Sequence, residues 1–459
     1  MLSLLRRRLR RAAGLLSPRL WGRNLMTWLA AIAVALVALG FARAADAAQG
    51  LFKHLLDGQP YRILVLAPAG LALSAWLTRR VFPGAQGSGI PQTIAALKLD
   101  NPRAVDAVLS PRIAVGKILL TLLGLACGAS IGREGPTVQV GASLMHAVGR
   151  RMVPDRLDLQ RGMVLAGGAA GIAAAFNTPL AGVVFAIEEL SHSFESRTSG
   201  TVLTAVILAG ITTLALAGNY TYFGSTTAEL NFGAGWIAVL LCALAGGLGG
   251  GVFSAILVAA SRGLPGRAGR LLMRHPIGFA ALCGLALAIL GLLSGGATYG
   301  TGYAQARGVV EGTADVAPLF AVEKLLATTV SYLSGIPGGI FAPSLAVGAG
   351  IGQWLANLVP HAPEGAVVLL GMVAYFSGVV QAPITATLIV MEMTDNQRMT
   401  IPLLATAMLA FGVSRLICRH PLYSALAVRF QAAVSRQPVP VAPVGTDARK
   451  GILRALSRR

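Results

Sequence analysis

The stretch Gly132-Arg133-Glu134-Gly135-Pro136 decides the fold of this chain. It sets two charged side chains and three helix-breaking residues between two apolar segments, residues 118–123 before it and residues 138–142 after it. An ionisable side chain at membrane depth costs about 2.5–3.5 kcal/mol on insertion scales, and such side chains are by default functional. Glu134 is therefore the first candidate functional residue.

Pro136 indicates that a helix begins at this point. Proline suits the first turn of a helix, because its missing N–H would have no intrahelical partner there. A helix that begins inside a membrane directs unpaired N–H groups and the positive end of its dipole toward whatever precedes it. The start of such a helix binds anions, and the carboxylate of Glu134 lies where it can occupy that site.

The composition indicates an all-α, polytopic membrane protein. Of the 459 residues, 55% are hydrophobic and only 12% are charged, whereas soluble domains carry about 25% charged residues. Apolar stretches recur at residues 25–42, 62–77, 113–131, 162–190, 202–217, 234–260, 276–297, 317–334, 340–358, 366–391 and 401–418. Several are shorter than the ~20 residues of a straight membrane span. Because many also contain glycine or proline, we expect tilted and broken helices, as in secondary transporters.

Much of the formal net charge of +20 lies at the two ends of the chain. Residues 1–24 contain seven arginines and no acid, and the segment from Arg419 onward contains eight Lys/Arg and one acid, Asp447. The positive-inside rule places both ends in the cytoplasm, and basic flanks of this kind mark topology and lipid contact rather than nucleic-acid binding.

These observations predict three regions in a multi-pass protein of the inner (cell) membrane. Residues 1–24 form a basic cytoplasmic segment, residues 25–430 the transmembrane domain, and residues 431–459 a short basic cytoplasmic tail. We interpret the apolar stretch at 25–42 as a retained first helix rather than a signal peptide, because it begins late and many spans follow.

Cysteine and histidine patterns favour neither a disulfide framework nor a metal site. The four cysteines include no C-x-x-C pair, and the six histidines include no H-x-x-x-H pair. We therefore expect no structural metal and no cofactor.

The two halves of the chain resemble each other loosely. The counterpart of the break at residues 132–136 is Gly335-Ile336-Pro337-Gly338-Gly339-Ile340-Phe341-Ala342-Pro343. After each break comes a long apolar segment with an amide, a proline and then an acid: Asn177-Thr178-Pro179 with Glu188-Glu189, and Gln381-Ala382-Pro383 with Glu392. Paired interrupted helices predict an inverted repeat with its site at the membrane midplane. We place repeat one at about residues 25–232 and repeat two at about residues 234–430.

Two further features complete the pattern. One is Gly87-Ser88-Gly89-Ile90-Pro91, and the other is Tyr423, which follows the last apolar stretch in His420-Pro421-Leu422-Tyr423-Ser424. In this order and at this spacing, the motifs resemble those of the CLC family of chloride channels and chloride/proton antiporters. The resemblance runs from about residue 25 to about residue 430. It implies two antiparallel helical repeats, assembled as a homodimer with one pore per subunit.

The resemblance also implies a chloride site. Ser88 and Tyr423 match the side chains that donate hydroxyls to a central anion, and Ile340 and Phe341 match backbone amides that line the site. Helix N-termini and hydroxyls can hold a partly dehydrated chloride without a full cation that would bind it too tightly.

The same resemblance gives the proton-carrying residues. Glu134 matches the external gating glutamate, with Gly132, Arg133, Gly135 and Pro136 as the supporting motif. Its carboxylate would compete with chloride, and protonation would free the site. Glu189 matches the internal proton-transfer glutamate of the antiporters.

Lys117 matches a buried lysine of the family, although its side chain could instead snorkel to the membrane surface. Other local interpretations stay open as well. Glu134 could form an ion pair with Arg133, Tyr423 could belong to an interfacial aromatic belt, and one of Glu188 and Glu189 could merely cap a helix in water.

The expected function is chloride transport, coupled to protons in an antiporter gated by Glu134. Some antiporters of the family carry an acid three residues after the G-S-G-I-P proline, where this chain has Ile94. A passive chloride channel, gated by voltage or pH, therefore remains the alternative. Ser88 favours chloride over nitrate, because nitrate-preferring relatives tend to have proline at this position, and Ser88 with Tyr423 argues against the fluoride-selective branch.

Two short stretches resemble motifs of other protein classes, but each match is incomplete. Residues 298–302 read Thr-Tyr-Gly-Thr-Gly and lack the Val-Gly order of a potassium filter, and residues 141–143 contain the Gly-x-Ser of an intramembrane serine protease. Such a protease needs a histidine base on a facing helix. We expect the histidines to lie beside polar or basic loop residues, as in Arg274-His275-Pro276, and we expect no enzyme activity.

Overall fold

The computed structural model describes residues 18–192, 196–263 and 274–435, together with Gly266, Gly269 and Leu272. Most of the two predicted basic terminal segments, residues 1–17 and 436–459, lies outside the described residues. The helices of repeat one are α2 (Pro18–Leu56), α3 (Ile63–Arg80), α4 (Ile90–Lys98), α5 (Pro102–Asp106), α6 (Pro111–Ala126), α7 (Glu134–Met152), α8 (Leu157–Phe176), α9 (Pro179–Phe185) and α10 (Ser196–Ala217). Those of repeat two and the C-terminal end are α11 (Ile237–Arg262), α13 (Pro276–Leu293), α14 (Tyr303–Glu311), α15 (Phe320–Leu333), α16 (Phe341–Ala356), α17 (Glu364–Val380), α18 (Pro383–Thr394), α19 (Thr400–Ile417) and α20 (Leu422–Ser435). Short turns are η1 (Pro60–Arg62), the π-helical segment η2 (Ala186–Ser191), η3 (Ala234–Trp236) and η4 (Gln397–Met399).

Eight helical segments among the described residues are long and apolar enough to cross a membrane. Large apolar side chains point outward from them, for example Leu203 and Ile207 of α10 and Leu240 of α11. An apolar exterior around a chain with few charges is the arrangement that a bilayer stabilises. The chain is therefore a multi-pass membrane protein, as predicted.

Two of the predicted apolar stretches, 162–190 and 366–391, are each divided into two helices. α8 is capped by Asn177 and α17 by Gln381, and both caps have left-handed backbone, with φ of 58° and 59°. Each is followed two residues later by a proline, Pro179 or Pro383, which begins the next helix. The break has the same local cause in both halves, because proline at the first helical position needs no N–H partner.

The acids after these breaks join the two halves reciprocally. Glu188 accepts hydrogen bonds from two backbone N–H groups at the start of α18, at 3.2 and 2.6 Å. Glu392 accepts hydrogen bonds from two N–H groups at the start of α9, at 3.2 and 2.8 Å. Each carboxylate thus caps a helix of the other half, where the helix dipole favours negative charge.

Two buried lysines repeat this correspondence. Lys117 of α6 donates to the carbonyl oxygen of Gly87 at 2.8 Å, in the loop before α4. Lys324 of α15 donates to that of Gly300 at 2.8 Å, in the loop before α14. Both side chains are fully buried. The suggestion that Lys117 snorkels is therefore wrong, and the glycine-rich stretch at 298–302 is the counterpart of the Gly-Ser-Gly loop rather than an ion filter.

Glycines let α16 and α17 pack backbone against backbone, and α7 and α8 do the same. A Cβ placed on Gly371 would lie 2.5 Å from the carbonyl oxygen of Gly348, and a Cβ on Gly167 would lie 2.4 Å from that of Gly141. Small residues at such crossings are what allow helices to approach closely in lipid. Gly141 of the Gly-x-Ser motif is thus a helix-packing residue.

We expect Gly371→Ala to destabilise the protein by about 1–3 kcal/mol, because the new methyl overpacks a contact between two backbones. The measurement is the midpoint of thermal unfolding in detergent, followed by the loss of monodisperse protein. Gly412→Ala in α19 is the matched control, since no atom lies within 4 Å of its Cβ position. Equal midpoints for the two variants would contradict the packing argument.

Candidate functional site

The three glycine-proline breaks meet at one point in the structure. Gly132 and Gly339 exchange two backbone hydrogen bonds of 2.7 Å, and Gly87 pairs with the segment Ile336–Gly338 through two bonds of 3.1 Å. These are isolated bridges, and the described residues contain no β-strand. Segments about 50 to 250 residues apart in the chain are therefore held together by their unwound backbone.

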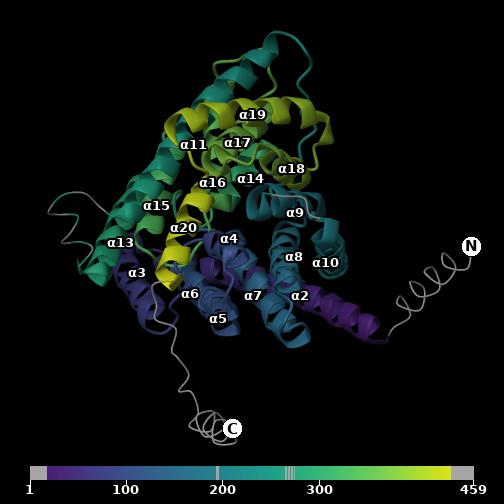
Figure 1. Ribbon diagram of the computed structural model, residues 1–459. Coiled ribbons are helices and arrows are strands. Elements are labelled where there is room, and N and C mark those ends of the chain that lie inside the picture. The colour runs from purple at the N-terminus through teal and green to yellow at the C-terminus, as the bar shows by residue number, and fades with distance from the viewer. Residues whose placement is uncertain are drawn as a thin grey trace, which may run out of the picture.

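Four helices begin around this crossing. They are α4, α7, α16 and α20, and Figure 1 shows α20, from the C-terminal end of the chain, beside α4. The first N–H groups of each helix have no intrahelical partner and carry the positive end of its dipole. Ile340 caps α16 and Phe341 is its first residue, and both residues are buried, so their amides are shielded from solvent. Helix starts of this kind have the N–H groups and the dipole that an anion requires.

Glycine is required where these backbones cross. A Cβ on Gly135 would lie 2.4 Å from Ser88 Oγ, and a Cβ on Gly89 would lie 2.9 Å from the carbonyl oxygen of Gly135. Gly89 also has φ of 102°, a conformation that other residues rarely adopt. The glycines thus bring the Ser88 hydroxyl against the first turn of α7, in which Pro136 is the third residue and lacks an N–H.

Ser88 and Tyr423 are brought together from opposite ends of the chain. Their side chains are buried, and their hydroxyls lie next to each other with no other hydrogen-bond partner among the described residues. A buried hydroxyl without a partner is costly. Both hydroxyls are therefore available to donate to an anion. Because Tyr423 is fully buried, its interpretation as an interfacial belt residue is wrong.

Glu134 lies in the positive region between the starts of α7 and α16. Its side chain is fully buried, and its carboxylate faces its own backbone N–H and that of Ala342. Oε1 also accepts a hydrogen bond of 3.1 Å from the hydroxyl of Tyr222. Arg133 points away, toward Asp46 at 3.5 Å, and its guanidinium lies over the ring of Tyr222. The ion-pair partner of Arg133 is therefore Asp46, and the carboxylate of Glu134 lies beside backbone N–H groups of two helix starts without a cation in contact with it among the described residues.

Aromatic side chains fix the start of α16. The ring of Phe341 contacts those of Phe176, Phe185, Phe376 and Tyr423, at centroid distances of 4.7 to 6.2 Å. Aromatic contacts of this kind add about 0.5–1.5 kcal/mol each beyond the buried area. They hold the amides of residues 340 and 341 in place, and the sequence motifs do not reveal the three partner phenylalanines.

The two adjacent acids after α9 differ in their surroundings. Both lie in the π-helical segment η2, a kind of turn that is frequent at functional sites. Glu188 caps α18, whereas Glu189 is 2% exposed, interacts electrostatically with Tyr423, and has one carboxylate oxygen without a hydrogen-bond partner among the described residues. Glu188 is therefore the capping residue, and the helix that it caps belongs to the other half of the chain.

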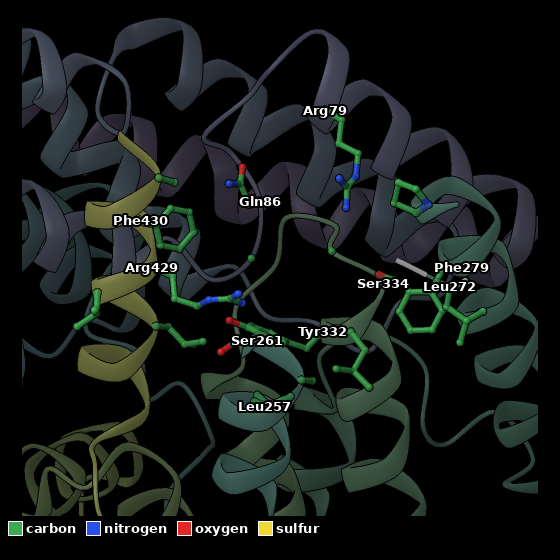
Figure 2. A pocket seen from close by; sticks show the side chains of 18 of the residues that line it. Arg79, Gln86, Leu257, Ser261, Leu272, Phe279, Tyr332, Ser334, Arg429 and Phe430 are labelled. Carbon is green, nitrogen blue, oxygen red and sulfur yellow. The ribbon is translucent and has the colours of Figure 1, made fainter. Parts of the chain in front are cut away.

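Two cavities approach the crossing from different sides. The larger one, here called the Arg429 cavity, has a volume of about 630 Å³ and reaches Gln86 and Gly87, next to Ser88. Arg79 and Arg429 point into it from α3 and α20, and Tyr332 lies at its inner end (Figure 2). The smaller one, the Arg133 cavity, has a volume of about 280 Å³, and Arg133 and Tyr222 line it. The anion site thus lies between two cavities that both carry arginine.

Comparisons with known proteins agree with this architecture. A family model described as "Voltage gated chloride channel" matches residues 69–415. The chain is 30% identical over 437 residues to the "H(+)/Cl(-) exchange transporter ClcA" of Yersinia pseudotuberculosis serotype IB (strain PB1/+), covering 88% of this chain and 87% of that protein.

Solved structures are similar over most of the chain. The crystal structure of a slow cyanobacterial Cl⁻/H⁺ antiporter has a TM-score of 0.76 at 25% identity and covers 92% of this chain and 99% of its own. The crystal structure of a CLC-type fluoride/proton antiporter has a TM-score of 0.73 at 20% identity and covers 87% of this chain and 96% of its own. At this identity the similarity shows the fold alone. The predicted all-α fold of two inverted repeats is confirmed. The chain belongs to the CLC family of voltage-gated chloride channels, to which its crossing of broken helices already pointed.

Proposed function

We propose that this protein exchanges chloride for protons across the cell membrane, with Glu134 as the gate. The observation that carries the proposal is the seat of the Glu134 carboxylate, by which we mean the buried position between the starts of α7 and α16, where no cation is in contact with the carboxylate among the described residues. A carboxylate in such a seat competes with chloride for the same N–H groups. Protonation removes that competition, so one side chain links the two ions.

Chloride is held by Ser88, Tyr423 and the backbone amides of Ile340 and Phe341. The two buried hydroxyls and the unpaired helix N–H groups support this role. Glycines 132 and 135, with Pro136, shape the backbone of the seat, while Arg133 and Lys117 act at a distance. Lys117 holds the loop before α4 through its carbonyl oxygens, next to Ser88.

Glu189 passes protons between Glu134 and the cytoplasm. Its burial and its electrostatic interaction with Tyr423 support this role, because a buried carboxyl without a full set of partners can both take up and release a proton. The same observation favours the antiporter over a passive chloride channel, which needs no acid at this place. The name of the ClcA relatives, H(+)/Cl(-) exchange transporter, points in the same direction.

The Arg429 cavity opens to the cytoplasm in this proposal, and both termini lie on that side. Residues of α20, including Ala432 and Ala433, line this cavity, and the basic C-terminal segment continues from the same helix. Clusters of arginine next to the membrane remain on the cytoplasmic side. Chloride and protons are the transported species, and we propose no cofactor.

We also propose that the protein is a homodimer in the lipid bilayer. α9 and α18 have only 7 and 12 residues, and Leu180 and Ile384 at their starts are exposed. Helices this short end within the membrane, and the carboxylates that cap their starts, Glu392 and Glu188, are costly against lipid. A second copy of the chain against this face would exclude lipid from them.

One observation bears on the distant alternative of a serine protease. His146 is a buried residue of α7 and not of a polar loop, which corrects the expectation from the sequence. Its Nε2, however, contacts Asp106 at 2.9 Å, and the hydroxyl of Ser143 has no hydrogen-bond partner among the described residues. No serine–histidine pair of the kind a nucleophile requires is formed there.

Purified protein in liposomes should couple the two ions. When chloride flows out of loaded vesicles, protons should move in against their gradient, because the seat of Glu134 alternates between chloride and a protonated side chain. A chloride electrode and a pH electrode in the same chamber measure both fluxes, with protein-free liposomes as the control. Chloride efflux without proton uptake would contradict the antiporter and support the passive channel. The absence of both fluxes would contradict chloride transport by this protein.

A further inference from the structure

Tyr222 separates Glu134 from the Arg133 cavity. Its side chain lines that cavity and is only 3% exposed, while its hydroxyl donates the 3.1 Å hydrogen bond to Glu134 Oε1. Glu134 itself does not line the cavity and is fully buried. Tyr222 thus contacts both the cavity and the carboxylate.

The tyrosine is held firmly in this position. Its ring packs edge-on against those of Phe176, Phe223 and Tyr303, at centroid distances of 5.4, 5.0 and 5.0 Å. The backbone on its C-terminal side is tied to α18, because the N–H of Phe223 donates to the carbonyl oxygen of Met393 at 3.1 Å. The hydroxyl is thus directed at Glu134 by packing on three sides.

The repeat makes Tyr222 the counterpart of Tyr423. In repeat one the left-handed cap Asn177 donates to the carbonyl oxygen of Tyr220 at 3.2 Å, just before Tyr222. In repeat two the left-handed cap Gln381 donates to that of Cys418 at 2.7 Å, in the segment that leads to Tyr423. Each tyrosine follows the last long helix of its repeat, α10 or α19.

The following residues complete the correspondence. Phe223 is bonded to the end of α18 in the other repeat, and Ser424 is bonded through its hydroxyl to His192, after α9, at 3.0 Å. The two loops therefore occupy equivalent places on opposite sides of the anion site. Tyr423 faces Ser88 on the side of the Arg429 cavity, and Tyr222 faces Glu134 on the side of the Arg133 cavity.

We propose that Tyr222 is a positioning residue for the gate: its hydroxyl holds the carboxylate of Glu134 in the seat and so weakens the competition of chloride for that seat. The proposal rests on the proposed function, in which Glu134 is the gate. The other polar groups that act on the carboxylate are Arg133, the backbone N–H groups of Glu134 and Ala342, and Tyr423. Arg133 also lines the Arg133 cavity, but its guanidinium pairs with Asp46, and Tyr222 is the cavity-lining residue that hydrogen-bonds the carboxylate.

The test is chloride binding to purified protein, measured by isothermal titration calorimetry at neutral pH. Tyr222→Phe keeps the packed ring and removes only the hydroxyl that donates to Glu134. Chloride should then bind about tenfold more tightly, which corresponds to the free energy of one hydrogen bond to a charged acceptor. Tyr220→Phe is the matched control: this tyrosine lines the same cavity without contacting Glu134, and chloride affinity should stay unchanged. A purely structural defect would weaken binding rather than tighten it.

A second variant guards against poor folding of the first. Asn177→Gly removes the amide that anchors Tyr220 and keeps the left-handed cap, so it should tighten chloride binding by a smaller factor. Unchanged affinity in both Tyr222→Phe and Asn177→Gly would overturn the proposal.

Glu134→Ala separates this proposal from the one on which it rests. It should tighten chloride binding by itself, and adding Tyr222→Phe to it should then have no further effect. If Glu134→Ala tightens binding while Tyr222→Phe does not, the positioning role fails and the gate stands. If Glu134→Ala leaves chloride affinity unchanged, the assignment of the gate fails and the role of Tyr222 fails with it.

Discussion

Replacement of Glu134 by glutamine is expected to abolish proton transport while chloride continues to cross. Glutamine has nearly the same shape and can still accept the hydrogen bond from Tyr222, but it carries no titratable proton and no charge that competes with chloride. Because the seat is otherwise intact, chloride flux persists. Proton flux should fall by at least about a hundredfold, the lower range of what a positioned acid or base contributes to proton transfer.

Simultaneous recording of chloride efflux and proton uptake from proteoliposomes measures this change. Glu364→Gln is the matched control, since Glu364 is an exposed acid at the start of α17 that lies outside the crossing, and both fluxes should match those of the unaltered protein. Proton uptake that survives in Glu134→Gln would show that another group carries the proton. Loss of both fluxes in a folded variant would instead give Glu134 a structural role.

The adjacent acids Glu188 and Glu189 should respond differently to the same substitution. Glu189→Gln should stop proton transport and leave chloride transport in place, because the carboxyl is buried and has an oxygen without a hydrogen-bond partner among the described residues. Glu188→Gln should keep both fluxes, since this side chain bonds the start of α18. Its loss of charge at a helix start should lower the free energy of unfolding by about 0.5–2 kcal/mol.

Flux assays and thermal unfolding of the same two purified variants distinguish these effects. Each variant is the control for the other, because the residues are neighbours in one turn and differ only in their partners. If Glu188→Gln abolished proton coupling and Glu189→Gln did not, the two roles would have to be exchanged. If neither affected coupling, protons would reach Glu134 by another route.

Much of the site could be predicted from the sequence, because its causes are local. Glycine and proline restrict the backbone at their own positions, so the breaks at residues 87–91, 132–136 and 335–343 were visible without a fold. The structure places Ser88, Glu134, Phe341 and Tyr423 around one crossing, as the motifs indicated. Pro179 and Pro383 likewise marked the breaks that divide two long apolar stretches.

The partners of the buried polar groups were not predictable in the same way. Arg133 was a plausible partner of its neighbour Glu134, yet its guanidinium lies toward Asp46, 87 residues away. Tyr222 has no motif around it, and its hydrogen bond to Glu134 spans 88 residues. Glu188 caps a helix that begins 195 residues later, for which a single acid in an apolar segment gives no signal.

The chain's own residues were thus enough to establish a membrane protein of broken helices with an anion site where the breaks occur. Composition sets the solvent in which the chain is stable, and glycine and proline set where a helix stops and starts. Tertiary structure alone decided which carboxylate caps a helix, which one is buried without a full set of partners, and which hydroxyl donates to Glu134. The reason is that a buried polar group takes whichever partner the packing of distant helices brings within hydrogen-bond distance, and sequence separation does not limit that choice.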